Sequence, residues 1–323
     1  MTLTRRCALG LVACAVLFSG AASAQEFPTR VIKMVVPYPA GGPTDAIARI
    51  VAEEMRRSLG QNVVVENIAG ASGAIGTRAV AKADPDGYTI VFGNNQTHGN
   101  NMFLLTNPGY DAVKDFAPLA GAGAFEHIFV VKNDLPAKTI PELVDLAKKD
   151  PGKLNYGSTG IGSGSHLSTE LFMVRTGTKM THVPFRSSGD VMNSINGGHI
   201  DVAFDNMTLA WPQAQAGTVR ALGVTSLERS STAPDVPAAS ETLPGFEATS
   251  WHGVFVPAGT PRPVVEKINA EVRRIVELPE VKSKLTEIGA VPSPMTPEEF
   301  TAFIKAERTK WEGVVKAAGL TGN

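Results

Sequence analysis

Cysteine is almost absent from this 323-residue chain. The two that occur, Cys7 and Cys14, both lie in an N-terminal segment that we expect to be removed. A chain that begins at Gln25 would therefore have no disulfide, no thiolate nucleophile and no cysteine-ligated metal.

The first residues have the pattern of an export signal. Arg5 and Arg6 precede an apolar run from Ala8 to Ala22, and Ala22-Ser23-Ala24 matches the small-residue pattern of a signal-peptidase site. We expect residues 1–24 to be a signal peptide, cleaved after Ala24, and the remaining chain to reside in the periplasm. Two alternatives stay open, namely lipid attachment at Cys14 and export through the twin-arginine pathway.

The chain also lacks a strong charge of either sign. It has 30 Lys and Arg against 31 Asp and Glu, so removal of Arg5 and Arg6 leaves a net charge of −3. A nucleic-acid or membrane-surface binder is usually basic, and we expect neither partner here. The length after the signal is sufficient for two lobes with cores of their own.

Strand and helix patterns alternate after the signal, which predicts βαβ units and mostly parallel sheets of an α/β fold. Strands are expected at 31–36, 63–65, 89–92, 128–131, 155–158, 182–185, 200–204, 221–225 and 251–256. The strands form two sets and the tail is helical, which predicts two α/β lobes around a ligand cleft. We place lobe 1 at 25–124 plus 250–323 and lobe 2 at 125–249, with the helical tail returning to lobe 1.

A glycine-containing loop, Tyr38 to Asp45, follows the first strand and precedes a helix. Parallel sheets bind ligands at the carboxyl ends of their strands, and free amides at a helix start form an anion site. Gly42 is suited to the N-cap, Pro43 to the first turn, and Asp45 to a capping position. A plain strand-to-helix turn is the alternative.

A second loop of this kind, Ser158 to His166, lies in the predicted lobe 2 and alternates glycines with hydroxyls. Further candidates are His98 in an amide-rich segment, Arg186 at a strand end, and Asp205 after another strand. Each has a structural alternative: a core histidine, a surface arginine and a helix cap.

Enzyme signatures are missing from the sequence. There is no G-x-S-x-G, no G-x-x-x-x-G-K-[ST] and no H-E-x-x-H, and the six histidines have no metal-ligand spacing. We expect no enzyme, no metal and no cofactor. The remaining rival is a periplasmic hydrolase that uses Ser163 or Ser165 with His166, although adjacent residues at a helix start make a poor nucleophile–base pair.

Several segments resemble the Bug family, the receptors of tripartite tricarboxylate transporters. They include Pro39-Ala40-Gly41-Gly42, Gly73-Ala74-Ile75-Gly76, Ala83 to Thr89, Tyr156 to Leu167, His182 to Phe185 and Pro257 to Pro261. The similarity runs in order through the chain after the signal. Ile68 and Arg186 depart from the family pattern, which more often has a basic residue and a lysine there.

The resemblance implies a periplasmic binding protein type II (Venus flytrap) fold and a small organic carboxylate held between two glycine loops. Carried over residue by residue, it indicates Tyr38, Ala40, Gly41, Gly42 and Thr44 in one lobe, and Ser158, Thr159, Gly160, Ser163, His166 and Asp205 in the other. The implied function is a solute receptor for an integral membrane transporter, and we expect the protein to be a monomer. A sensor that presents the ligand to a two-component system is the alternative.

Overall fold

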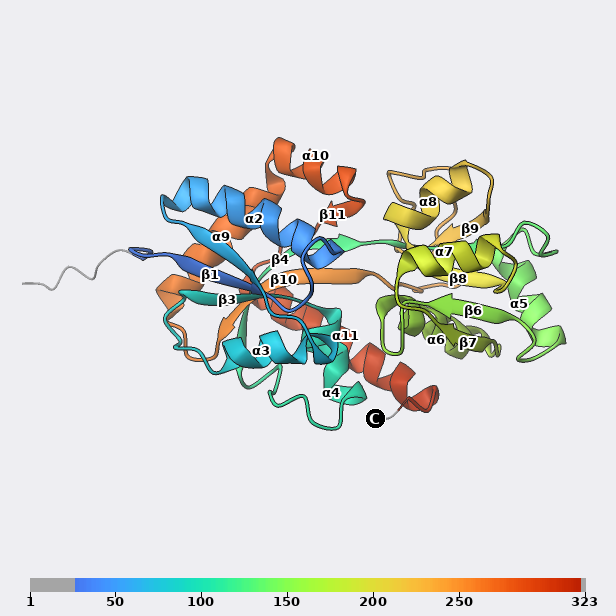
Figure 1. Cartoon of the computed structure of the whole chain (residues 1–323), viewed down its shortest axis with the longest axis horizontal. Coiled ribbons are helices and arrows are strands. Elements are labelled where there is room, and N and C mark those ends of the chain that lie inside the picture. The colour runs from blue at the N-terminus through green and yellow to red at the C-terminus, as the bar shows by residue number, and fades with distance from the viewer. Residues whose placement is uncertain (1–26, 321–323) are drawn as a thin grey trace, which may run out of the picture.

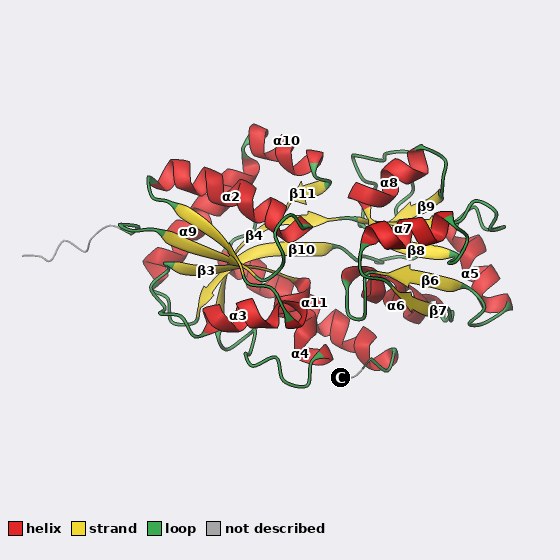
Figure 2. Cartoon of the chain, in the orientation of Figure 1, coloured by secondary structure: helices red, strands yellow, loops and turns green. Residues whose placement is uncertain are grey.

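The computed structural model describes residues 27–320, and the predicted signal peptide lies outside them (Figure 1). Two sheets form the centres of two lobes, and helices cover both faces of each sheet (Figure 2). The strands are β1 (Ile32–Val36), β2 (Val63–Asn67), β3 (Thr89–Asn94), β4 (Phe116–Phe125), β5 (His127–Val131), β6 (Asn155–Ser158), β7 (Thr181–Pro184), β8 (Val202–Asn206), β9 (Arg220–Val224), β10 (Ser250–Pro257) and β11 (Ala290–Pro292). The α-helices are α2 (Pro43–Leu59), α3 (Ala74–Ala81), α4 (Asn101–Leu104), α5 (Ile140–Lys149), α6 (Gly164–Thr176), α7 (Ser188–Asn196), α8 (Met207–Gln215), α9 (Arg262–Glu277), α10 (Pro279–Glu287) and α11 (Pro297–Ala317). Short helical turns are η1 (Ala71–Gly73), η2 (Gln96–Asn100) and η3 (Ala239–Glu241).

Lobe 1 contains a six-stranded sheet in the order β11-β4-β10-β3-β1-β2. β1 pairs in parallel with β2 and β3, whereas β10 runs antiparallel to β3 and β4. Apolar residues spaced along α2, such as Ile47 and Val51, pack with Ile268 and Val272 of α9 on one face. Phe300 of α11 belongs to the cluster on the other face. This packing fixes the start of α2 at the carboxyl end of β1.

Lobe 2 contains a five-stranded sheet in the order β7-β6-β8-β5-β9. β6 is parallel to β7 and β8, while β5 is antiparallel to β8 and β9. Val191 and Ile195 of α7 pack on one face, and Leu171 and Phe172 of α6 pack on the other. The two-lobed α/β architecture predicted from the sequence is therefore present. Each sheet is more mixed than predicted, because an antiparallel strand enters it from the hinge: β10 in lobe 1 and β5 in lobe 2.

Two stretches of chain cross between the lobes. β4 passes through Glu126 into β5, and the segment after β9 returns through Thr249 into β10. The crossings are bonded to each other: the Ser250 hydroxyl lies 3.1 Å from His127 Nε2, and Thr225 Oγ1 accepts from His127 N at 3.0 Å. Thr225 Oγ1 also donates to the Ala248 carbonyl oxygen at 2.7 Å within the returning segment. These contacts define a compact hinge at the base of the cleft.

The helical tail only partly follows the prediction. α9, α10 and the start of α11 pack in lobe 1, but Trp311, Val314 and Val315 belong to the core of lobe 2. α11 begins with a capping box between Thr296 and Glu299 and runs across the back of both lobes (Figure 1). The helix is thus a third connection between the lobes. None of the helices between residues 27 and 320 combines the length and apolarity needed to span a membrane.

Candidate ligand-binding site

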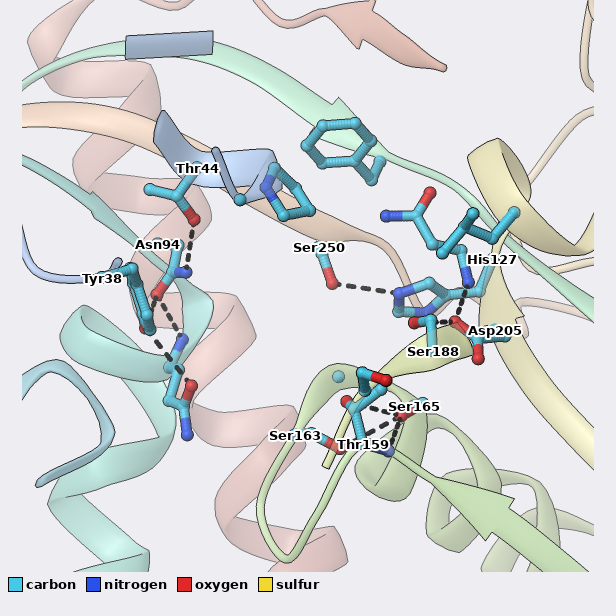
Figure 3. A pocket seen from close by; sticks show the side chains of 18 of the residues that line it. Tyr38, Thr44, Asn94, His127, Thr159, Ser163, Ser165, Ser188, Asp205 and Ser250 are labelled. Atoms are coloured by element: carbon cyan, nitrogen blue, oxygen red, sulfur yellow. Dashed lines mark hydrogen bonds between the residues drawn. The ribbon is translucent and has the colours of Figure 1, made fainter. Parts of the chain in front are cut away.

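A cavity of about 640 Å³ lies between the two lobes. Figure 3 shows Tyr38, Thr44 and Asn94 on one side of it and Thr159, Ser163 and Asp205 on the other. The lining consists of strand ends, helix starts and hinge residues: Tyr38, Pro39, Ala40, Gly41, Gly42, Pro43, Thr44, Asn94, Asn95, Gln96, Phe125, His127, Thr159, Ser163, Gly164, Ser165, Arg186, Ser187, Ser188, Gly189, Asp205, Asn206, Leu209, Ser250 and His252. Both lobes therefore contribute to a single site.

Asp45 fixes the loop between β1 and α2. Its carboxylate accepts hydrogen bonds from Gly41 N (2.8 Å), Arg49 Nε (2.8 Å) and Asn67 Nδ2 (2.9 Å). Burial opposes ionisation of this carboxyl, but the three donors outweigh it and hold the pKa of Asp45 below its ordinary value. Gly41 has φ +82°, a conformation that a side chain would strain. Asp45 thus shapes the loop from behind and lies outside the cavity lining.

Four helices begin at the cavity, and their N-terminal ends differ. Ser163, Ser187 and Asn206 cap α6, α7 and α8 with their side chains, each accepting a bond from a backbone amide of its own helix. α2 begins at Gly42, which has no side-chain cap. The first amides of a helix have no intrahelical acceptor, so those after Pro43 remain available at the cavity. The helix dipole adds positive potential at this point.

An oriented chain of hydrogen bonds forms the lobe 1 wall. Tyr38 donates to Asn94 Oδ1 at 2.9 Å, and Asn94 Nδ2 donates weakly to Thr44 Oγ1 at 3.5 Å. Nδ1 of His252 faces the Ser250 carbonyl oxygen, which can only accept, so the proton is on Nδ1. Nε2 then accepts from the Thr44 hydroxyl at 3.0 Å. Burial lowers the pKa of His252 to about 4, which keeps the ring neutral at pH 7.

The loop between β6 and α6 presents hydroxyls from lobe 2. Ser165 Oγ accepts from Thr159 N at 3.0 Å and lies 3.2 Å from Thr159 Oγ1 and 3.1 Å from Ser163 Oγ. Gly160 and Gly162 have φ values of +114° and +78°, which the turn requires. The result is a cluster of hydroxyl groups opposite the start of α2.

His166 lies beneath this loop rather than at its surface. Its Nδ1 accepts from Gly162 N at 3.0 Å, and its Nε2 faces Glu170 Oε1 at 3.6 Å. Both ring nitrogens are engaged away from Ser163 and Ser165. The nucleophile–base pair considered for a hydrolase therefore does not exist in this arrangement.

Two charged residues line the cavity. Arg186 is exposed and has no hydrogen bond or ion pair among residues 27–320. Asp205 is 2% exposed; its Oδ1 accepts from Ser188 Oγ and Asn206 N, each at 2.7 Å, while its Oδ2 has no partner in the described chain. Desolvation raises the pKa of Asp205 above its ordinary value. Opposite charges on one wall would favour a ligand with more than one polar group.

The structure brings together most of the residues that the sequence singled out. Those in the lining are Tyr38, Ala40, Gly41, Gly42, Thr44, Thr159, Ser163, Arg186 and Asp205. Ser158, Gly160 and His166 lie within or behind the lobe 2 loop, and Asp45 lies behind the lobe 1 loop. His98 is fully buried in lobe 1, where its ring stacks on Phe255 with the centroids 3.6 Å apart. The prediction that His98 contacts ligand has no support in this geometry.

Sequence reasoning did not select several residues of the lining. Asn94 is the last residue of β3 and Gln96 the first of η2. The amide-rich composition of this segment was the available sequence signal. Ser188 and Asn206 are helix-start residues next to predicted candidates. Ser250 gave no signal, because it belongs to the hinge. Among residues 27–320, no group of three or more histidines, cysteines or acidic residues could hold a metal ion.

Two hinged α/β lobes with helix starts converging on a shared polar cavity are the architecture of a solute-binding protein. The family model described as "Tripartite tricarboxylate transporter family receptor" matches residues 47–320. The chain belongs to this family.

Individual relatives agree over nearly the full length. Protein BugT of Bordetella pertussis is 33% identical and covers 99% of each chain, and a UPF0065 protein encoded in the tcbD-tcbE intergenic region of Pseudomonas sp. is 39% identical over 92% of this chain and 89% of its own. Among solved structures, R. palustris Rpa4515 with adipate is 34% identical with a TM-score of 0.80, covering 92% of this chain and all of its own. MatC of Rhodopseudomonas palustris with bound malate is 35% identical with a TM-score of 0.75, and the match covers 90% of this chain and 100% of the MatC chain.

Proposed function

We propose that this protein is a periplasmic receptor that captures a small organic carboxylate between its lobes and passes it unchanged to a membrane transporter. The uncapped start of α2, facing a cavity that both lobes share, carries the proposal. The solved relatives with adipate and malate support a carboxylate as the ligand class, and the relative BugD is described as a periplasmic binding protein.

The carboxylate would sit at the free amides after Pro43, with hydroxyls from the opposite loop completing its hydrogen bonds. Thr159, Ser163 and Ser188 supply such hydroxyls at the cavity wall. Because the two sets of donors belong to different lobes, an anion that touches both favours the arrangement in which they face each other. Arg186 would then pair with a second anionic group of the ligand.

The binding test compares organic acids with their neutral amides in thermal unfolding of the chain from residue 25. Malate and adipate are the acids, and malamide and adipamide are the matched controls. A ligand at about 100 times its dissociation constant should add about 2.7 kcal/mol to the free energy of unfolding. Equal shifts from an acid and its amide would contradict the anion site.

The absence of chemistry is tested separately. After prolonged incubation, mass spectrometry should recover the bound acid unchanged, and gel filtration should show a monomer with and without it. Formation of a new product would favour an enzyme instead. Delivery is tested by reconstituting uptake with the cognate membrane subunits, where a receptor is required for transport and a sensor is not.

A further inference from the structure

A second cavity, of about 390 Å³, lies in lobe 1 between α11 and the chain from α4 to β4. We call it the α11 groove. It is lined by Phe103, Ala112, Val113, Phe116, Pro118, Thr301, Ile304, Lys305, Arg308, Thr309 and Glu312. None of these residues lines the cleft between the lobes. The groove is therefore a separate feature, which the proposed function does not use.

The wall of the α11 groove is mainly apolar. Phe116 and Ile304 are buried in the lobe 1 core, and Phe103 is partly buried against the lobe 2 core. Val113 lies at the opening with 60% of its surface exposed. An apolar cavity of this size with a few convergent polar groups is typical of a small-molecule site, for which about 300–1,000 Å³ is usual.

The charged groups of the α11 groove that have no ion-pair partner in the described chain are cationic. Lys305 and Arg308 form no ion pair within residues 27–320, whereas Glu312 is paired with Lys316 at 2.6 Å. The guanidinium carbon of Arg308 lies 5.5 Å from the centre of the Phe103 ring, and Arg308 Nη1 is buried without a hydrogen-bond partner in the described chain. A buried donor that lacks an acceptor is destabilising, and a bound anion would supply the missing acceptor.

The one carboxylate in the groove lining, Glu312, is paired with Lys316, and the two titratable groups buried beside Arg308 carry no negative charge. His98, which faces it from η2, is neutral: burial and then the charge of Arg308 lower its pKa to about 3. Tyr110, a second buried group that senses this charge, has a pKa raised by burial to about 12 and is also neutral at pH 7. The guanidinium thus faces aromatic rings and the groove.

We propose that the α11 groove is a second binding site, which takes a small organic acid with an apolar body and a single carboxylate. The apolar body would contact Phe103, Phe116 and Ile304, and the carboxylate would pair with Arg308 and Lys305. The volume of about 390 Å³ suits a small free acid rather than a protein segment. Since α11 packs in the cores of both lobes, the occupant would contact the helix that connects them.

Naphthalene-2-carboxylate is a suitable probe, titrated into the uniformly ¹⁵N-labelled chain from residue 25 and followed by amide chemical shifts. We expect saturable shifts at Ala112, Val113 and Ile304, and at least tenfold weaker binding of naphthalene-2-carboxamide at the same amides. Shifts confined to the cleft, or equal binding of acid and amide, would overturn the proposal. The outcome is independent of cleft binding, because the two sites share no lining residue.

Two pairs of variants test whether the carboxylate of the probe binds in the α11 groove beside Arg308. Arg308→Gln should weaken the probe at least tenfold, whereas Arg262→Gln, at an arginine with an 84% exposed side chain, should not. Val113→Glu at the exposed rim should weaken it severalfold by repulsion, and Val113→Lys should not. If Arg308→Gln does not fold, the two Val113 variants still test the proposal. Equal affinities of Val113→Glu and Val113→Lys for naphthalene-2-carboxylate would reject the site.

Discussion

The Thr208 hydroxyl donates a hydrogen bond to the carbonyl oxygen of Ile288 at 2.9 Å, and this bond joins the two lobes. Thr208 lies in the first turn of α8 in lobe 2, and Ile288 follows the last residue of α10 in lobe 1. The neighbouring Gly289 is packed so closely against Thr208 that an added Cβ would lie 2.5 Å from its hydroxyl oxygen. Lobe separation must break this contact.

Thr208→Val should therefore shift the protein toward a more open arrangement. Loss of one hydrogen bond of about 1 kcal/mol corresponds to about fivefold weaker ligand binding. Small-angle scattering should give a larger radius of gyration for the unliganded variant. Thr208→Ser, which keeps the hydroxyl, is the matched control, and an unchanged affinity in Thr208→Val would show that the bond does not influence closure.

Gly42→Asp should occupy the anion site with the protein's own carboxylate. The backbone at Gly42 has φ −80°, and a Cβ there would meet only Pro39 O at 3.6 Å, so a side chain fits. Capping α2 should raise the free energy of unfolding by about 1 kcal/mol, while calorimetric binding of the acid is lost. Gly42→Ala should still bind. Retained binding in Gly42→Asp would place the ligand elsewhere.

Asp45→Asn should destabilise the protein by about 2 kcal/mol at pH 7, since a charge-assisted bond to Arg49 and a bond from Gly41 are lost. The folded pKa of Asp45 is lowered, so its contribution is complete above the unfolded value of 3.8 and disappears as the pH falls through the folded pKa. Urea unfolding at pH 7, 5 and 3 should give a constant difference at the first two values and a smaller one at pH 3. Asp84→Asn, at an exposed site, is the control and should differ from the parent by less than about 0.5 kcal/mol. An equal difference at all three values would exclude ionised Asp45 as the source.

His98→Phe should reduce the pH dependence of stability and leave ligand affinity unchanged. The folded pKa of about 3 lies below the ordinary value of 6.5, so unfolding takes up one proton at intermediate pH. Stability is then complete above pH 6.5 and falls by up to about 1.4 kcal/mol per pH unit as the pH drops toward 3. Urea unfolding between pH 6 and 4 should show this slope reduced in the variant. Weaker acid binding by His98→Phe at pH 7 would restore His98 as a ligand contact.

Much of the fold could be read from hydrophobic periodicity. Strands such as Val63–Asn67 and Thr89–Asn94 are apolar and β-branched, and they lie within two residues of the prediction at each end. β4 was not predicted, because Phe116–Phe125 is built largely from Ala, Gly and Pro, which have low strand propensity. Gly121 is needed there, since a Cβ would lie 2.4 Å from the Ser293 carbonyl oxygen. Tertiary packing, not local preference, makes this segment a strand.

The residues of the site that could be predicted are those whose position follows from local chain geometry. Gly42 and Ser163 stand at strand-to-helix junctions, which sequence spacing identifies. His98 has the same kind of sequence environment, and only the packing against Phe255 reveals that it belongs to the core. Ser250 and His127 meet across 123 residues of sequence, a pairing that no local pattern contains.

The helix that runs behind both lobes has a consequence for how solute enters and leaves. Ile304 is packed in the core of lobe 1 and Trp311 in the core of lobe 2, so α11 holds the two lobes together on its side of the molecule. The two lobes can then separate only on the side of the cleft that faces away from α11. A ligand of the cleft would therefore enter and leave through that rim alone.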